Sequence, residues 1–510
     1  MKKFSLHKQH KWFGLCICFF IMMFSLSGIV LNHREAVAEM DVSRKYLPKA
    51  YRFSQWNNGL LRGTLVLDDE GWGECRSEQT TAEVPASKVL IYGAGGLWLT
   101  DSLASFCKDF NEGLPPGADL RNIRAVVQMP DGKLFAVGSF GLFERRLNGI
   151  WQEVKLPKSK GERLSDLTSR GDTLVVLSRS FVYVAASPYK SFQKVELRKP
   201  LGRSVKVTLF RTVWLLHSGE LFGPGGKLVA DALALVFLLL ALTGLGYWLV
   251  PKIVKRRGQR SMRALRATKF LHDKTGRFTI VLTLLVCLTG WCLRPPLMVP
   301  LVLHKTRPLP LPSLGSSNPW QDKLRMIRFD ETFNDWLIST SDGFYALRDW
   351  KALPIKLSTA PPVSVMGLNV WQKDGEGRWL CGSFSGLYAW DREWNISYDY
   401  FTGSTESQVG KSPFGDVAVS GFSYDFAKGP CVVTYGAGTS QIFQPESLST
   451  LPMSLWNVAL EVHSGRIYFG SAATLFFIFL AGAAILWCLW SGWLIRERRR
   501  RSERRTHPAA

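Results

Sequence analysis

The chain has 510 residues, enough for several domains, and carries a formal net charge of +23 at pH 7. Most of this charge lies in three clusters beside apolar segments. Residues 1–11 hold four Lys, 252–277 hold ten Lys or Arg and one Asp, and 496–505 hold seven Arg and two Glu. This arrangement is typical of the cytoplasmic loops of a membrane protein, so the charge does not indicate nucleic acid as a partner.

Four apolar segments are long enough to cross a bilayer, which needs about 20 residues. They cover roughly 12–32, 229–250, 277–301 and 468–495. With the basic clusters on the cytoplasmic side, both termini are cytoplasmic and two large polar inserts lie on the opposite side. In a bacterial inner membrane that side is the periplasm.

The sequence therefore predicts eight consecutive parts, alternating between the two sides of the membrane. They are the N-terminus with membrane helix one (1–33), a periplasmic β-rich insert (34–215), helix two (216–251), a basic cytoplasmic loop (252–276), helix three (277–303), a second periplasmic β-rich insert (304–462), helix four (463–495) and a basic cytoplasmic tail (496–510).

The first apolar segment has a second interpretation. Lys2 and Lys3, the apolar stretch and Ala36-Val37-Ala38 together resemble a cleavable signal peptide. The stretch is longer than a usual signal-peptide core, and its pattern returns in the third segment, where no cleavage could occur. We favour a retained helix, with cleavage as the alternative.

Two histidines mark the first and third apolar segments in the same way. His10 and His272 each stand four residues before a glycine. A second glycine follows that glycine by 14 residues, and a small residue directly precedes it. These later dipeptides are Ser27-Gly28 and Thr289-Gly290.

Two further histidines mark the second and fourth segments. His217 and His463 are each followed by Ser-Gly, and Thr243-Gly244 and Ser491-Gly492 stand at nearly the same distance downstream. The chain therefore reads as an internal duplication of helix, insert and helix. Glycines at such positions are expected to let membrane helices approach closely.

These recurring His–Gly signatures resemble the PepSY-associated transmembrane family of iron-regulated inner-membrane proteins, which includes haem-containing ferric-siderophore reductases. The resemblance covers the four helices and does not extend to the inserts. It implies that electrons cross the membrane and reduce ferric iron, often bound to a siderophore, in the periplasm.

Sidedness sorts the four histidines into two pairs. His10 and His272 belong to the cytoplasmic side, and His217 and His463 belong to the periplasmic side. A pseudo-two-fold axis along the membrane normal would set each pair face to face, so that each supplies two axial nitrogens to a b-type haem. Two such haems suit electron transfer, because bis-histidine ligation leaves the iron no open position. The alternative is that each histidine simply hydrogen-bonds a neighbouring helix or a lipid headgroup.

His33 is a secondary candidate for the periplasmic site. It follows His10 by 23 residues, about 34 Å along a helix. It could replace a ligand, hydrogen-bond a haem propionate or relay protons. Arginines near the two faces are candidates for propionates or for interfacial anchoring: Arg34, Arg294, Arg466 and Arg277. The remaining histidines are expected to be structural or incidental: His7, His304 and His507.

The inserts contain a weaker repeat of strand, short turn and strand. Copies begin at Lys88, Lys133, Trp336 and Trp379, and looser ones lie near Thr173 and Cys431. The spacing of about 40–45 residues fits one propeller blade. The two inserts together are expected to form one propeller-like domain, with two separate β-sandwich-like domains as the alternative.

Four of the nine cysteines lie in the inserts, where an oxidising compartment permits disulfides. Cys75–Cys107 and Cys381–Cys431 are the within-insert pairings among three connectivities. The other five are expected to be small apolar residues of the helices: Cys16, Cys18, Cys287, Cys292 and Cys488.

The expected protein is thus a multi-pass inner-membrane haem protein that passes electrons to ferric iron or a ferric siderophore. No residue is expected to act as a catalytic acid or base. No convincing nicotinamide or flavin fingerprint is present, so the electron donor is a separate cytoplasmic partner or a membrane quinol. Two alternatives remain: a non-redox accessory or permease for iron or siderophore uptake, and a sensor or scaffold with a periplasmic β binding module.

Overall fold

The computed structural model divides the chain into two compact units, and each unit takes residues from both halves of the sequence. The helical unit holds Met1–Val37, Ser204–Ser316 and Leu455–Ala510, and the β unit holds Ala38–Arg203 and Ser317–Ser454. The residues that the structure describes are 5–68, 87–202, 206–254, 260–311, 313–364, 366–405, 417–469 and 471–506.

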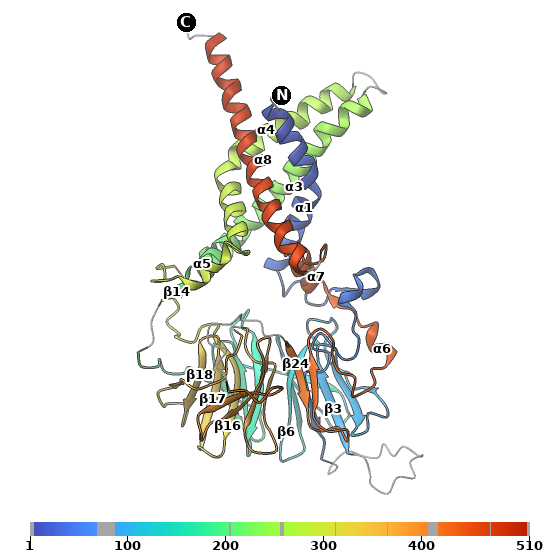
Figure 1. The fold of residues 1–510 in the computed structure, drawn as a ribbon, viewed down its shortest axis with the longest axis vertical. Coiled ribbons are helices and arrows are strands. Elements are labelled where there is room, and N and C mark those ends of the chain that lie inside the picture. Colours follow the sequence, from blue (N-terminus) through green and yellow to red (C-terminus); the bar gives the residue numbers. More distant parts are fainter. Residues whose placement is uncertain are drawn as a thin grey trace. The chain divides into compact units, whose positions relative to one another are not determined.

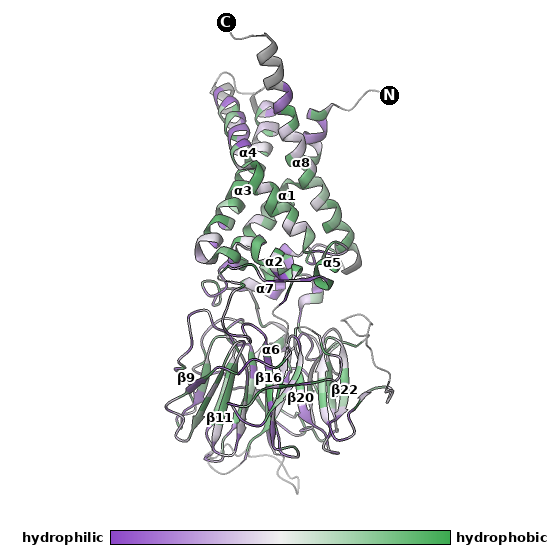
Figure 2. Cartoon of the chain, turned by 90° about the vertical axis from the view of Figure 1, so that its left-hand side faces the viewer, coloured by the Kyte–Doolittle hydropathy of each residue, from purple (hydrophilic) through white to green (hydrophobic). Residues whose placement is uncertain are grey.

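The helical unit is built on four long helices, α1 (Leu6–Asn32), α3 (Gly223–Val254), α4 (Arg260–Cys292) and α8 (Ser471–Thr506). Each contains a segment long and apolar enough to cross a membrane, and within the described ranges these are the four such segments. Hydrophobic residues dominate the helices in Figure 2. The chain is therefore a multi-pass membrane protein.

The four long helices contact one another in a ring. Contacts join α1 to α3, α3 to α4, α4 to α8 and α8 back to α1, as the bundle in Figure 1 illustrates. Each helix of the N-terminal half thus touches a helix of the C-terminal half.

Short helices precede two of the membrane helices. They are α2 (Leu209–His217), which leads into α3 through the 3-10 turn η3 (Glu220–Phe222), and α7 (Leu455–His463), which leads into α8. Each ends at a histidine, and the glycine two residues later has a positive φ, +78° at Gly219 and +77° at Gly465. The Ser-Gly that follows both histidines is therefore a helix-ending turn, which glycine adopts without steric cost.

The helix predicted at 277–301 is displaced in the structure. α4 begins at Arg260 and ends at Cys292. It begins earlier because its basic first turns continue the helix beyond the apolar segment, and it ends earlier because Pro295 and Pro296 follow closely. The helical unit also contains α5 (Met298–Leu303) and the strand pair β14 (Val207–Thr208) and β15 (Lys305–Thr306).

The described part of the β unit holds five four-stranded antiparallel meanders and two two-stranded sheets, one of which is the β1–β26 pair described below. Apart from this pair, the strands of each sheet follow one another in chain order. They are β2 (Gly63–Val66), β3 (Lys88–Gly93), β4 (Gly96–Asp101) and β5 (Lys108–Asp109); β6 (Ile123–Gln128), β7 (Leu134–Gly138), β8 (Leu142–Arg145) and β9 (Trp151–Val154); β10 (Leu164–Arg170), β11 (Thr173–Ser178), β12 (Val182–Ala186) and β13 (Gln193–Val195); β16 (Leu324–Asp330), β17 (Asp335–Thr340), β18 (Gly343–Leu347) and β19 (Ile355–Leu357); β20 (Val370–Lys373), β21 (Trp379–Ser383), β22 (Gly386–Asp391) and β23 (Ile396–Asp399); β24 (Val419–Ser423) and β25 (Cys431–Thr434).

Smaller elements complete the β unit. β1 pairs with β26, which joins the beginning of the first insert to the end of the second. The bounds of these elements are β1 (Asp41–Val42), η1 (Arg44–Tyr46), η2 (Lys49–Tyr51), α6 (Glu446–Ser449) and β26 (Met453–Ser454).

The second strands of the meanders are buried along their length, as in β7, β17 and β21, because apolar neighbours cover both faces of each sheet. One apolar cluster joins Val175 and Leu177 of the first insert to Ile338 of the second. Another joins Ile91 of β3 to Val433 of β25. The two inserts therefore share one core, and the alternative of two separate sandwich-like domains is wrong.

The predicted disulfide Cys381–Cys431 is also wrong. Both residues are free buried thiols. Cys381 packs between the sheets that begin with β16 and β20, whereas Cys431 packs against the first sheet of the unit. Cys107 is likewise a free thiol, and its predicted partner Cys75 lies outside the described residues.

A buried carboxylate joins two neighbouring sheets and generates a prediction about pH. Asp330 accepts hydrogen bonds from Trp379 Nε1 at 3.0 Å and from Arg392, and Lys373 Nζ lies 3.3 Å away. Burial alone would raise the pKa of Asp330, but these hydrogen bonds and charges outweigh burial and lower it. The carboxylate therefore stabilises the fold above its unfolded pKa of about 3.9, and this stabilisation is lost as pH falls through the lower folded-state value.

Asp330→Asn is expected to cost about 3 kcal/mol of unfolding free energy at pH 7, because Arg392 loses a buried anionic partner. The deficit should shrink as pH falls below about 3.9. Denaturant unfolding followed by tryptophan fluorescence measures both. The control is Asp342→Asn, which removes the partner of Lys323 from an exposed pair and should cost less than about 1 kcal/mol. Equal costs for the two variants would contradict the prediction.

Candidate functional site

The four signature histidines form two close pairs in the helical unit. His10 of α1 and His272 of α4 have ring centroids 6.2 Å apart with an interplanar angle of 75°. His217 of α2 and His463 of α7 have centroids 6.2 Å apart with an angle of 52°. The structure thus brings together the same partners that the charge pattern and the repeat predict.

The two pairs lie at opposite ends of the long helices. α1 carries His10 and, 17 residues later, Ser27, which contacts His463 of the other pair. α4 carries His272 and, also 17 residues later, Thr289, which contacts His217. Seventeen residues of α-helix rise about 26 Å, most of the thickness of a bilayer core.

Each imidazole is anchored through Nδ1 to a helix of the opposite half of the chain. His10 Nδ1 lies 3.0 Å from the Cys488 carbonyl oxygen and 3.1 Å from Ser491 Oγ on α8. His463 Nδ1 lies 3.0 Å from the Phe24 carbonyl oxygen and 3.1 Å from Ser27 Oγ on α1.

The other two histidines repeat this arrangement. His217 Nδ1 lies 3.1 Å from the Val286 carbonyl oxygen and 3.2 Å from Thr289 Oγ1 on α4. His272 Nδ1 lies 2.9 Å from Thr243 Oγ1 on α3. All four contacts therefore join one half of the sequence to the other.

These contacts determine which ring nitrogen carries the proton. A carbonyl oxygen only accepts, so Nδ1 must donate to it. Each Ser or Thr hydroxyl already donates to a carbonyl of its own helix and so accepts from the imidazole: Ser27 to Met23, Thr243 to Leu239, Thr289 to Leu285 and Ser491 to Cys488. The neutral ring consequently carries its proton on Nδ1 and presents the lone pair of Nε2.

A glycine stands against each anchored ring. A Cβ added at Gly28 would lie 3.4 Å from His463 Cε1, and one added at Gly244 would lie 3.5 Å from His272 Cε1. At Gly492 the distance to His10 Cε1 is 3.1 Å, and at Gly290 it is 2.7 Å to His217 Cε1. Each of these glycines thus faces an imidazole of a neighbouring helix, and a larger side chain would crowd that ring.

The spacing within each pair suits one metal ion between two imidazoles. A metal–imidazole bond of about 2.0 Å, with the nitrogen about 1.1 Å from its ring centroid, gives about 6.2 Å between opposed centroids. Nδ1 held by a carbonyl or hydroxyl is also the usual outer partner of a ligating histidine. Within the described ranges no cluster of three or more His, Cys, Asp or Glu could hold a metal ion.

His33 takes a different place. It caps the end of α1, and its Nε2 lies 2.7 Å from Asp231 Oδ2 of α3. Asn32 Nδ2 donates to the other oxygen of Asp231 at 3.0 Å. His33 is therefore hydrogen-bonded to Asp231, and the two histidines that pair at that end are His217 and His463.

The candidate arginines differ in the groups that they contact. Arg34 stacks over Trp456, 3.9 Å from the ring centroid, and Arg466 Nε lies 2.9 Å from Glu461 Oε2. The charge of Arg294 acts on both His217 and His463. Among these candidates Arg294 is thus the arginine whose charge acts on the second histidine pair, whereas Arg34 contacts Trp456 and Arg466 contacts Glu461.

The sequence contains the Ser/Thr-Gly dipeptides as a visible pattern, but it does not show that they contact the histidines. Their spacing from the histidines pointed to a repeat, and only the packing of neighbouring helices shows that they receive imidazoles. The helix pairs are α1 with α7, α4 with α2, α3 with α4, and α8 with α1. No sequence pattern could identify the acceptor carbonyls of Phe24, Val286 and Cys488, because every residue has a backbone carbonyl.

A family model described as the PepSY-associated TM region matches residues 7–500. The chain belongs to this family. The match includes both histidine pairs of this PepSY-associated protein and confirms the family that its helix signatures resemble. A search of curated proteins found no match.

Solved structures give only distant likenesses to this PepSY-associated protein. One is "the extracellular domain of the putative one component system BT4673 from B. thetaiotaomicron", at 11% identity and a TM-score of 0.32, covering 77% of this chain and 40% of that one. A second, of the hybrid two component system BT4673, has 11% identity and a TM-score of 0.31, covering 71% and 38%. This chain spans less than half the length of either.

The anchoring generates a prediction about proton positions. Nitrogen NMR of the diamagnetic protein with isotope-labelled histidine should find His10, His217, His272 and His463 protonated at Nδ1, whereas free imidazole favours Nε2. Thr243→Val should weaken this preference at His272 alone, because the acceptor at 2.9 Å is lost and only the backbone hydrogen bond to Leu240 is left. Thr243→Ser keeps an acceptor and serves as the control. An unchanged His272 signal in the valine variant would contradict the assignment.

Proposed function

We propose that this protein holds two b-type haems, one in each histidine pair, and passes electrons across the membrane to ferric iron. The observation that carries the proposal is the identical anchoring of four imidazoles, each held at Nδ1 with Nε2 left for a ligand. A histidine that only hydrogen-bonds a neighbouring helix would need no second imidazole 6.2 Å away.

The residues present fit the group. His10 with His272, and His217 with His463, would each supply two axial nitrogens, and the adjacent glycines leave room beside each ring. Arg294 would hold a propionate beside the second pair, since a guanidinium pairs well with carboxylates. When bound, bis-histidine haem supplies reversible one-electron chemistry without an open position for oxygen.

The two histidine pairs of the chain set where electrons enter and leave the membrane-spanning path. The anchored pairs lie about 26 Å apart along the helices. Each electron comes from a membrane quinol or a cytoplasmic partner, enters near His10 and His272 and leaves near His217 and His463, where Fe³⁺, free or siderophore-bound, becomes Fe²⁺. The basic clusters support an inner-membrane orientation with both termini cytoplasmic and both inserts periplasmic.

The β unit supports a second structural proposal, a six-bladed propeller. Its sheets are meanders, and one apolar cluster joins the sixth sheet back to the first through Val433 and Ile91. Residues of β3, β6, β10, β16 and β20 line one common cavity. The internal duplication is likewise supported by histidine contacts that run between the halves in equivalent ways.

The pairing predicts which haem each histidine variant loses. His10→Ala and His272→Ala should remove the same b-type bands, and His217→Ala and His463→Ala should remove the other set. His33→Ala and His304→Ala are matched controls and should keep both haems, because His33 binds Asp231 instead. Reduced-minus-oxidised spectra with a redox titration measure the loss. A colourless, folded wild-type protein from haem-replete cells would contradict the proposal.

Each anchoring hydroxyl should affect the haem affinity only of the histidine pair that it contacts. Loss of an outer partner typically costs about 10–100-fold in metal affinity. Thr243→Val is expected to weaken haem binding at the His10–His272 pair, and Thr289→Val at the His217–His463 pair. Haem titration into apoprotein measures each affinity, with the serine variants as controls. An equal loss at both sites from one variant would contradict the structural assignment.

A further inference from the structure

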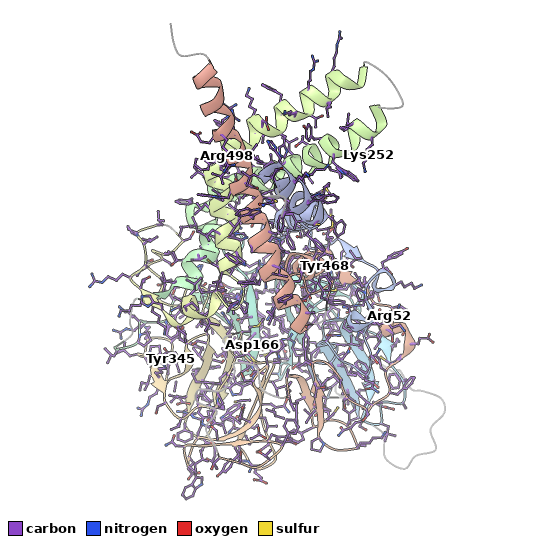
Figure 3. All side chains as sticks on the ribbon, turned by 45° about the horizontal axis from the view of Figure 1, so that its top comes forward. Arg52, Asp166, Lys252, Tyr345, Tyr468 and Arg498 are labelled. Atoms are coloured by element: carbon purple, nitrogen blue, oxygen red, sulfur yellow. The ribbon has the colours of Figure 1, made fainter. Side chains whose placement is uncertain are left out.

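The β unit encloses a cavity of about 180 Å³ where several sheets meet. Its walls include Tyr92 of β3, Arg124 of β6 and Arg328 of β16, together with Arg62 just before β2 and Trp371 of β20. Figure 3 marks Asp166, whose carboxylate pairs with Arg328, among the side chains of this unit.

The lining of the cavity is strongly basic, with three guanidinium groups. Arg328 has its own partners, since Nη1 lies 2.6 Å from Asp166 Oδ2 and Nε donates to the Trp371 carbonyl at 2.8 Å. Arg124 Nε donates to Ser139 Oγ at 2.9 Å. These contacts orient two of the three guanidinium groups and neutralise one positive charge.

Arg62 is the group without a counter-ion. Its Nε is buried and has no hydrogen-bond partner, and no hydrogen bond of its guanidinium occurs among the described residues. The charge of Asp166 acts on Arg62, but Asp166 Oδ2 accepts from Arg328 and from the Ile327 amide at 2.8 Å, and its buried Oδ1 makes no hydrogen bond to Arg62. Asp425 acts on Tyr92 but accepts from Thr64 and does not line the cavity. Arg62 is half-buried with a buried Nε, and a guanidinium without an ion pair is costly in such a place, so this one favours an anion in the cavity.

Tyr92 adds a neutral donor to the same wall. Burial raises the pKa of Tyr92, so its phenol keeps its proton at neutral pH and can donate it. Burial lowers the pKa of Arg62, but a guanidinium still stays protonated in a protein. The cavity therefore offers a charged and a neutral donor on neighbouring strands.

We propose that this cavity is a binding site for a small oxyanion of the size of phosphate or a short dicarboxylate. Arg62 is its principal charged contact, with Tyr92 and Arg124 as further donors. Forked guanidinium groups suit such oxygens. The volume corresponds to about six waters at about 30 Å³ each, enough for a phosphate-sized anion and too small for a ferric siderophore. This site is independent of the haem proposal.

The test titrates inorganic phosphate, and separately malonate, into the purified full-length protein at constant ionic strength, with calorimetry as the readout. We expect saturable binding of at least one probe. Arg62→Met should weaken it at least tenfold, because the charge is lost while the side-chain length is kept. Arg52→Met removes an equal charge from an exposed position and should leave the affinity within twofold.

Unfolding measurements separate a binding role for Arg62 from a structural one. The bound probe should raise the unfolding temperature of the wild type and of Arg52→Met, and leave that of Arg62→Met unchanged. Without a probe, Arg62→Met should be at least as stable as the wild type, since an uncompensated charge is removed. If Arg62→Met does not fold, Tyr92→Phe, which keeps the packing, should weaken binding about threefold, the value of one neutral hydrogen bond.

Two results would overturn the proposal. One is the absence of saturable binding of either probe to the wild type, which would leave a cavity that holds only water. The other is binding that persists unchanged in both Arg62→Met and Tyr92→Phe, which would place the anion elsewhere on this basic protein.

Discussion

The interaction on which the helical unit depends is the hydrogen bond from a histidine Nδ1 to a serine or threonine of the opposite half. It occurs four times, and each time an adjacent glycine makes room for the ring. A polar group at membrane depth needs a partner within the protein, because lipid supplies none. The four bonds meet this need and at the same time lock the two halves together.

One such bond between membrane helices contributes only about 0.6 kcal/mol, so the four do not account for the stability of the bundle. Their effect is on orientation. They fix the ring tautomer and leave the same nitrogen of each imidazole for a ligand, and they place the two pairs at opposite ends of α1 and α4. A site that must hold two axial ligands in a set geometry gains from this preorganisation before any cofactor binds.

The β unit also takes residues from both halves of the sequence, and it contains a different kind of polar constraint. Arg328 has Asp166, and Arg392 has Asp330 and Asp335, so these buried guanidinium groups are neutralised within the protein. Arg62 has no such partner. Arg328 and Arg392 thus belong to structural ion pairs, whereas Arg62 is the arginine that we propose receives a ligand.

The sequence by itself determined the membrane class, the family and the partners within each histidine pair, because apolar length, basic flanks and repeated signatures are local patterns. It did not determine where α4 begins, since helix continues into polar residues, nor the free state of Cys381 and Cys431, since disulfide formation depends on which cluster each thiol joins. The distance along α1 made His33 a secondary candidate for the periplasmic site, and only the tertiary structure showed its contact with Asp231. The use of Ser27, Thr243, Thr289 and Ser491 as imidazole acceptors, and the convergence of three arginines on one cavity, were likewise decided by packing, which joins segments hundreds of residues apart.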